Sequence, residues 1–577
     1  MSHICRRDSF PAYQPPPTAP GSSMTRSRVI VIIGIVIGSM ATHSHTLQAS
    51  DSLHVQIDAL ISTHPDFKKP AAITDDASFL RRVTLDLAGT IPTADEVREF
   101  LADSAPDKRT KLVDRLLGSP QYARRMQYVF DTMLMERRPN KHVTAEQWHA
   151  YLKDSFLQNK SWRQLSQELL SADGTDEQSR AAARFLLDRE LNVDQVTRDI
   201  GRIFLGRDLE CAQCHDHPAI DDYLQRHYYG LAAFIKRSYL VKDPKTKKSS
   251  IGEKAEGDVE FTSVFTSETD QTPPRMLDAP PIIDPPSRGQ LYTVKPEKNV
   301  RAVPVYSRRL QLAKSLTDDA NRAFRENIAN RMWALMMGRG LVDPVDMWHA
   351  QNPPSHPELL NLLADSLLEH DYDLRYLLRE LALTDTYQRS SRRDALDHDA
   401  NSNRATDFSV ALLKPLSPEQ LALSMMRATG VAEQQLAVAI SKQEKTEDPQ
   451  LALDPIWQEE ALNKSLASDT KVFVNIFGFE GVQNTAFDAS ADQALFLRNG
   501  ALVQRWVAQK NGLSDRLNAL DNDAIAEELY VSVFSRLPDA DETMFIDEML
   551  DATTDRKADL QQLVWAALVS TEFRFNH

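Results

Sequence analysis

The residue pattern with the most specific chemistry is a C-x-x-C-H motif formed by Cys211, Cys214 and His215. Its spacing is that of a c-type haem attachment site. Two thiols about one helical turn apart can form thioether bonds to the two vinyl groups of a haem, and the imidazole that follows can bind the iron. We therefore predict that Cys211 and Cys214 anchor a haem and that His215 is its proximal ligand. The third cysteine, Cys5, precedes the export signal described below.

The second axial ligand of such a haem has several candidates. His217 lies only two residues after His215, and two residues span about 7 Å at most, so it cannot round the macrocycle to the opposite face. His227 follows after a turn of the chain, and Met276 is the first methionine after the motif, in a proline-flanked loop. His349, from the second half of the chain, is a further candidate.

The same motif is compatible with other chemistry. Exported cysteines often form a disulfide or a redox-active dithiol. A zinc site is a further interpretation, because thiolates and imidazoles are ligands that zinc prefers. Its ligands would be Cys211, Cys214, His215 and His217, with His227 as a substitute for one of the histidines. The sequence leaves these interpretations open beside the haem.

A second group of polar side chains lies in the C-terminal half. Asp343, Asp346, His349 and His356 fall in one stretch with Trp348, a combination that a metal site or an acid–base cluster could use. Polar loops of this kind are more often hydrogen-bonded structure, which is what we expect here. The sequence names no catalytic residue, and it leaves open whether the protein is an enzyme.

The N-terminus has the order of a secretory signal. A segment rich in proline and serine, 1–23, precedes a short basic segment that begins at Met24, and the apolar run 29–38 follows. This run is shorter than the roughly 20 residues that a membrane-spanning helix needs. We therefore predict an exported protein, periplasmic or associated with the cell envelope. An uncleaved signal-anchor is the alternative, and it would be the one link to a membrane that we expect.

Composition is that of a folded soluble protein, with 42% hydrophobic and 26% charged residues among 577. The formal net charge of −15 argues against a nucleic-acid binder, which normally presents a basic face. Composition gives no information on the oligomeric state.

Hydrophobic periodicity predicts a mainly α-helical protein with two helical domains joined by a proline-rich linker. We expect an unstructured extension and signal peptide over 1–49, and a helical domain that carries the C-x-x-C-H motif over 50–240. The linker, 241–304, contains a small β excursion, with a strand expected over 258–266. A second helical domain fills 305–577.

Local signals place the starts of several helices. Capping boxes are expected at Thr93, Ser355 and Ser417, each followed three residues later by Glu or Gln. Asp216, directly after the motif, is expected to cap the next helix. A polar stripe on the predicted helix 322–337 points to a buried contact between the two halves of the chain; it consists of Asn327, Asn330, Arg331 and Trp333.

Longer runs of residues carry a family resemblance. The run 204–218, with 228–234 after it, resembles the planctomycete cytochrome-like domain, known as domain of unknown function 1549, and the earlier runs 79–89 and 112–120 are similar to its opening. The second half resembles the domain that usually follows it, domain of unknown function 1553. The similar runs there are 327–333, 338–342, 353–360, 384–390 and 492–500.

This resemblance implies a large exported protein whose cytochrome label rests on the C-x-x-C-H motif, in a family associated with redox steps or polymer breakdown. A single haem in a large helical protein favours electron transfer or redox sensing, and it implies a redox partner protein. The alternative is a non-redox periplasmic binding or scaffold protein, in which the Cys/His cluster is a zinc or disulfide clasp.

Overall fold

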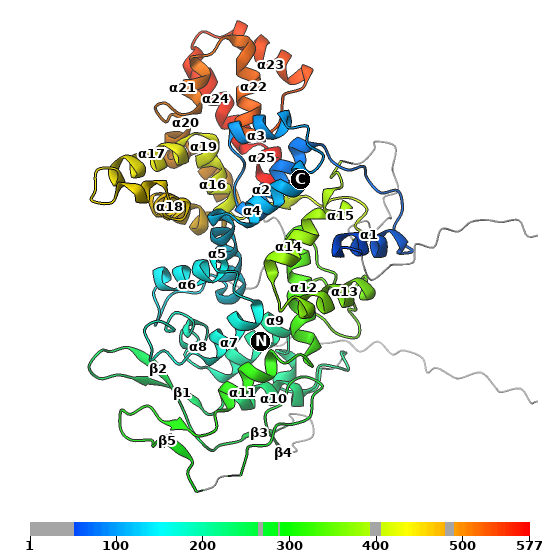
Figure 1. Cartoon of the computed structure of the whole chain (residues 1–577), viewed down its shortest axis with the longest axis vertical. Coiled ribbons are helices and arrows are strands. Elements are labelled where there is room, and N and C mark those ends of the chain that lie inside the picture. The colour runs from blue at the N-terminus through cyan, green and yellow to red at the C-terminus, as the bar shows by residue number, and fades with distance from the viewer. Residues whose placement is uncertain (1–50, 218, 263–268, 287–288, 393–405, 479–489) are drawn as a thin grey trace, which may run out of the picture. The chain divides into compact units, whose positions relative to one another are not determined.

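The computed structural model describes residues 51–217, 219–262, 269–286, 289–392, 406–478 and 490–577 (Figure 1). The predicted signal segment and Cys5 lie outside these ranges. The prediction of a mainly α-helical protein is confirmed, because the described strands form only two-stranded sheets beside a long series of helices. Within the described ranges, no helix has both the length and the apolar character that crossing a membrane requires.

The first half is a series of helices. They are α1 (Leu53–Thr63), α2 (Asp76–Ala88), α3 (Ala94–Ala102), α4 (Lys108–Leu117), α5 (Pro120–Met135), α6 (Ala145–Leu157), α7 (Trp162–Ser171), α8 (Arg184–Leu187), α9 (Val193–Leu205) and α10 (Gln225–Ile235). The capping box predicted at Thr93 is present: the Thr93 side chain accepts from the backbone N–H of Glu96, and the Glu96 side chain accepts from that of Thr93. A short 3-10 helix, η1 (Cys211–Gln213), separates α9 from α10.

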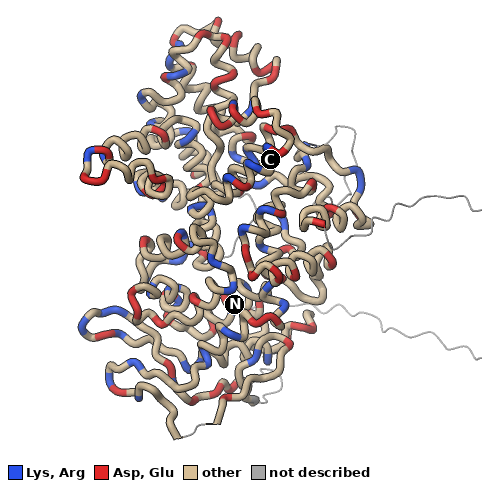
Figure 2. The backbone as a smooth tube through the Cα atoms, in the orientation of Figure 1, with Lys and Arg blue, Asp and Glu red and all other residues tan. Residues whose placement is uncertain are grey.

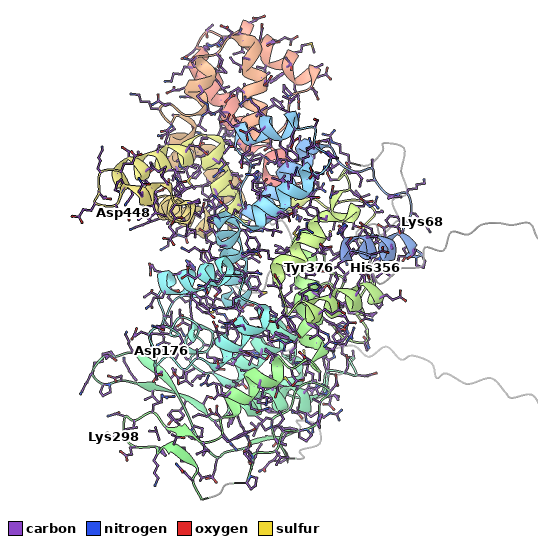
Figure 3. The ribbon with its side chains drawn as sticks, viewed as in Figure 1. Lys68, Asp176, Lys298, His356, Tyr376 and Asp448 are labelled. Carbon is purple, nitrogen blue, oxygen red and sulfur yellow. The ribbon has the colours of Figure 1, made fainter. Side chains whose placement is uncertain are left out.

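The linker between the halves contains more β structure than the sequence predicts. Its strands pair as three antiparallel hairpins: β1 (Ser238–Lys242) with β2 (Ser249–Glu253), β3 (Val259–Thr262) with β4 (Thr269–Thr272), and β5 (Tyr292–Val294) with β6 (Val303–Pro304). The strand expected over 258–266 is confirmed for the part that the structure describes, β3. Lys298, labelled in Figure 3, lies in the turn between β5 and β6.

The second half is again helical. Its elements are α11 (Arg308–Leu316), α12 (Arg322–Met337), α13 (Pro357–Glu369), α14 (Leu374–Leu383), α15 (Asp385–Gln388), β7 (Lys414–Pro415), α16 (Pro418–Ala428), α17 (Val431–Gln443), η2 (Pro449–Leu453), α18 (Pro455–Phe477), α19 (Ala491–Asn499), α20 (Ala501–Val507), α21 (Leu513–Asn518), α22 (Asn522–Phe534), α23 (Ala540–Asp551), α24 (Arg556–Val569), α25 (Thr571–Arg574) and β8 (Phe575–Asn576).

Two of the local predictions for this half can be checked. The capping box at Ser417 is present at the start of α16. The one predicted at Ser355 is wrong, because α13 begins one residue later, with His356 at the N-cap and without a side-chain cap. The Ser355 hydroxyl instead lies 3.1 Å from Nδ1 of His356.

The main hydrophobic core does not divide at the linker. It contains residues from Leu53 to Ile251 together with residues from Met276 to Phe408, so α12–α14 pack into the same core as the first half. A second core is formed mostly by α16 and the helices that follow it. The buried contact expected for the polar stripe of α12 is confirmed, since Asn327 donates a hydrogen bond to the backbone oxygen of Ile203. Basic and acidic residues are interspersed along the backbone (Figure 2).

Candidate functional site

The C-x-x-C-H motif lies in the connection between α9 and α10, residues 206–224. Helix α9 ends at Gly206, whose positive φ of 67° suits glycine, and a Cβ there would come within 2.9 Å of the Asn327 side chain. Cys211 then opens η1, and Cys214 directly follows it. Side chains three residues apart are eclipsed in a 3-10 helix, so this turn directs both thiols to the same side. Both cysteines are exposed and neither forms a disulfide.

His215 is held by the backbone beside it. Its Nδ1 lies 2.7 Å from the backbone oxygen of Asp216. Because a carbonyl oxygen only accepts, Nδ1 carries the ring proton and the lone pair is on Nε2. A metal-binding histidine typically has this arrangement, with the non-ligating nitrogen donating to a backbone oxygen. The imidazole is half-buried.

Asp216 and Gln225 connect the motif to α10. The Asp216 carboxylate accepts from the backbone N–H of Gln225, the first residue of α10, at 2.7 Å. The contact with the start of the next helix expected for Asp216 is therefore present. In return, the Gln225 side chain donates to the backbone oxygen of Cys214 at 3.0 Å. These two hydrogen bonds connect the motif to the first residue of α10.

His217 has the opposite tautomer from His215. Its Nδ1 accepts hydrogen bonds from the backbone N–H groups of Ala219 and Ile220, at 3.1 and 3.0 Å. The ring proton is then on Nε2, which makes that atom a donor. Within the described ranges, no group of three or more His, Cys, Asp or Glu side chains is arranged to hold a metal ion. The four candidate zinc ligands are therefore neighbours in the chain without being gathered around one point.

Two of the three predicted distal ligands, His227 and Met276, are buried side chains. His227 is buried on α10, with Nδ1 at 3.0 Å from the backbone oxygen of Asp222 and Nε2 at 3.8 Å from Asp278. Burial is the main cause that lowers its pKa. Met276 is buried in the main core, and the Asn321 amide lies 3.8 Å from its sulfur. The Nδ1 contact of His227 is of the same kind as that of His215 and puts its lone pair on Nε2, whereas Met276 would have to leave the core to bind iron.

The predicted polar cluster of the second half separates into three places. His349 packs against the ring of Tyr223 at 5.5 Å, on the motif's own loop. Asp346 lies 3.5 Å from Arg202 of α9. His356, labelled in Figure 3, is buried instead against the ring of His64, with centroids 4.1 Å apart. The group is hydrogen-bonded structure, as expected, and not one acid–base cluster.

Residues 346–351, which we call the clamp loop, hold the motif from the second half of the chain. Before the motif, the backbone N–H of Asp208 donates to the backbone oxygen of Asp346 at 2.9 Å. The backbone N–H of Trp348 donates to the backbone oxygen of Gly206 at 3.0 Å. After the motif, the Asp222 carboxylate accepts from the backbone N–H of Ala350.

Side chains reinforce the clamp loop. The Arg207 guanidinium lies over the Trp348 ring at 3.7 Å, within the range of a cation–π contact, and forms an ion pair with Asp222 at 3.0 Å. The Tyr223 hydroxyl donates to the backbone oxygen of Trp348 at 2.9 Å. The residues before and after the motif are thus fixed to the same loop.

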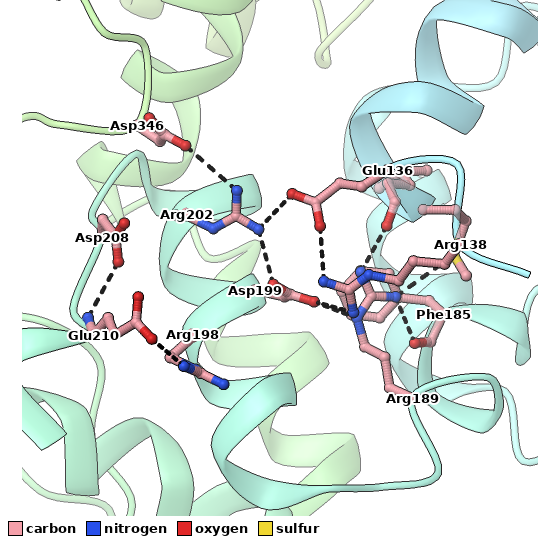
Figure 4. Close-up of polar contacts among 12 residues, drawn as sticks. Glu136, Arg138, Phe185, Arg189, Arg198, Asp199, Arg202, Asp208, Glu210 and Asp346 are labelled. Atoms are coloured by element: carbon pink, nitrogen blue, oxygen red, sulfur yellow. Dashed lines mark hydrogen bonds and ion pairs between the residues drawn. The ribbon is translucent and has the colours of Figure 1, made fainter. Parts of the chain in front are cut away.

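A buried charge network includes Asp199 and Arg202 of α9, the helix that precedes the motif (Figure 4). Asp199 pairs with Arg189 at 2.6 Å and with Arg202 at 2.9 Å, and Arg202 reaches Glu136 at 2.5 Å. Burial alone would raise the pKa of Asp199, but Arg189 and Arg138 outweigh it and hold the pKa below its usual value. Sequence reasoning missed this network; the spacing of Asp199 and Arg202 along one helix was the one signal for it.

Two cavities lie away from the motif. One, of about 250 Å³, is lined by polar residues that include Gln147, Tyr151 and Lys160. The other, of about 410 Å³, is lined by residues of both halves that include Arg98 and Arg427. Neither is lined by the C-x-x-C-H residues.

Two family models match the chain in sequence order. The model described as PSCyt2, protein of unknown function (DUF1549), matches residues 56–239, which include the motif. The model described as PSD1, protein of unknown function (DUF1553), matches residues 308–550, which include the clamp loop. No curated protein and no solved structure matches the chain.

Proposed function

We propose that this chain, which matches the DUF1549 model over 56–239 and the DUF1553 model over 308–550, is a cytochrome-like protein of the cell envelope. Cys211, Cys214 and His215 would hold one c-type haem, and the protein would transfer electrons to a redox partner or sense redox state. The observation that carries this proposal is the combination of two exposed, unbonded thiols with a histidine whose lone pair is on Nε2.

The residues of the motif fit the needs of such a group. Two thiols that a 3-10 turn directs to one side can react with both vinyl groups on one edge of the ring. The Asp216 backbone oxygen fixes the tautomer of His215 that can bind iron. A bound haem would supply one-electron chemistry at its iron. The chain's own part is to hold the ring rigidly, through the Gln225 bonds and the clamp loop.

The distal position has two candidates in the proposal, His227 and Met276. Met276 would have to leave the core, whereas His227 could keep its Nδ1 bond to the Asp222 backbone oxygen and bind through Nε2. We propose zinc binding or a disulfide between Cys211 and Cys214 as the alternative state of the motif. Zinc is less well supported, because His217 uses its Nδ1 lone pair on backbone N–H groups.

The proposal is tested by expressing the full chain in a bacterial host with a c-type haem maturation system and recording a pyridine haemochrome spectrum. We expect one haem per chain, its loss in the variant C211A/C214A, and its retention in the control C5A. Stoichiometric zinc, or a complete disulfide, in haem-free wild-type protein would overturn the haem proposal in favour of the clasp.

A further inference from the structure

Tyr229 of α10 contacts the turn that carries the two cysteines. Its hydroxyl donates a hydrogen bond of 2.9 Å to the backbone oxygen of Gln213, which lies between Cys211 and Cys214. Burial, followed by the charges of Asp194 and Cys214, raises the pKa of Tyr229. Tyr229 is therefore next to the positions where a haem would be attached.

The Tyr229 ring is part of a stacked aromatic pair. Its partner is Phe261 of β3, with ring centroids 4.6 Å apart and planes inclined by only 7°. Tyr228 packs edge-on against Tyr229 at 5.1 Å and 80°, and donates a hydrogen bond from its hydroxyl to Asp194. Tyr228 is fully buried, whereas Tyr229 and Phe261 are half-buried. The two rings thus form a face-to-face aromatic stack that is partly open to solvent.

A haem held only by surface thiols would leave a large planar apolar ring in water, which is unfavourable. Aromatic side chains offer a flat partner of matching shape and prefer offset stacking or edge contacts. They also exclude water, and solvent exposure is one of the factors that set a haem's reduction potential.

We infer that Tyr229 and Phe261 form an aromatic wall against which a haem attached at Cys211 and Cys214 packs. This inference rests on the proposed function, and it assigns strand β3 a role in the haem site. The hydrogen bond from the Tyr229 hydroxyl to the backbone oxygen of Gln213 connects this wall to the turn that carries both thiols.

The test uses the haem-loaded full chain and the variants Y229L and F261L, which keep apolar bulk but remove one ring. A haem is achiral, so its circular dichroism in the Soret region arises largely from coupling to nearby aromatic rings. We expect both variants to retain one haem per chain, to lose much of the Soret dichroism, and to have a lower midpoint potential because water reaches the ring. The variant Y229F, which keeps the ring, should retain most of the dichroism.

The control is Y292L, which removes a half-buried tyrosine from another hairpin, β5–β6. Thermal unfolding of each variant reports whether the fold is kept. If Y229L and F261L bind haem with the Soret dichroism and midpoint potential of the wild type, the proposed aromatic wall is wrong, while the proposed haem site stands. Absence of covalent haem in the wild-type chain would overturn the proposed function and the wall together.

Discussion

The carboxylate of Asp222 accepts a hydrogen bond from the backbone N–H of Ala350, 128 residues further along the chain, at 3.2 and 3.3 Å from its two oxygens. The same carboxylate forms an ion pair with Arg207, which is only 7% exposed. Asp222 therefore connects the residues before the C-x-x-C-H motif, the residues after it and the DUF1553 half. Both halves of the chain contribute residues that hold the motif in place.

Replacing Asp222 by Asn should weaken this connection. The amide can still accept from Ala350 but leaves the buried Arg207 without its counter-charge, at a cost of about 1–3 kcal/mol. Urea unfolding followed by circular dichroism measures the loss. The matched control is D221N, which removes an exposed carboxylate next to it and should change stability by less than about 0.5 kcal/mol. Equal stability of the two variants would show that the clamp loop does not depend on Asp222.

Asp199 should be among the most sensitive positions of the chain. The variant D199N keeps the shape of the side chain but leaves Arg189 and Arg202 without a shared buried partner. Breaking a buried ion pair from one side costs about 3–5 kcal/mol. Denaturant titration of D199N against D95N, whose carboxylate is 91% exposed and 3.7 Å from Arg98, checks the contrast. A loss in D199N no larger than in D95N would contradict the account of the network.

Stability should fall as the solution is acidified from about pH 6.5 toward pH 4. Burial, reinforced by His64, lowers the pKa of His356 to about 4 from its ordinary 6.5. A folded pKa below the unfolded one means that the unfolded chain binds the proton more tightly. The stabilising effect of the neutral ring is complete above pH 6.5 and is lost through this window at about 1.4 kcal/mol per pH unit.

The variant H356Q separates this effect from other titrations. It should lower stability at pH 7 and make its pH dependence shallower between pH 4 and 6.5, as followed by thermal unfolding at several pH values. His577 at the C-terminus, whose pKa is also lowered to about 4 by burial, should account for part of the remaining slope. The same slope in H356Q as in wild type would rule out His356 as its source.

What the sequence predicts well is local. The capping box of Thr93 and Glu96 needs only residues three positions apart, and the C-x-x-C-H motif needs five consecutive residues. Both are recognisable without knowledge of the fold. Ser355 has the same spacing to Glu358, yet the helix begins after His356, because the capping pattern does not fix where the backbone turns.

What the sequence misses depends on distant contacts. The contact between Asp222 and Ala350 cannot be recognised from one sequence, and neither can the pairing of Arg202 with Glu136, 66 residues away. Apart from β3, which the sequence predicts, the strands of the linker are short and lack the alternation that marks a half-buried strand. The tautomer of His217 depends on backbone N–H groups that converge only when the turn is formed.

Covalent binding of one haem at the motif can be detected on the tryptic peptide 208–226, which contains Cys211, Cys214 and His215. The measurement is the mass of this peptide from protein matured in a host that attaches c-type haem. We predict the peptide mass plus that of one haem, with both cysteines resistant to alkylation. A peptide that lacks the haem mass and carries two alkylated cysteines, or one that has only lost two hydrogens to a disulfide, would contradict covalent haem binding.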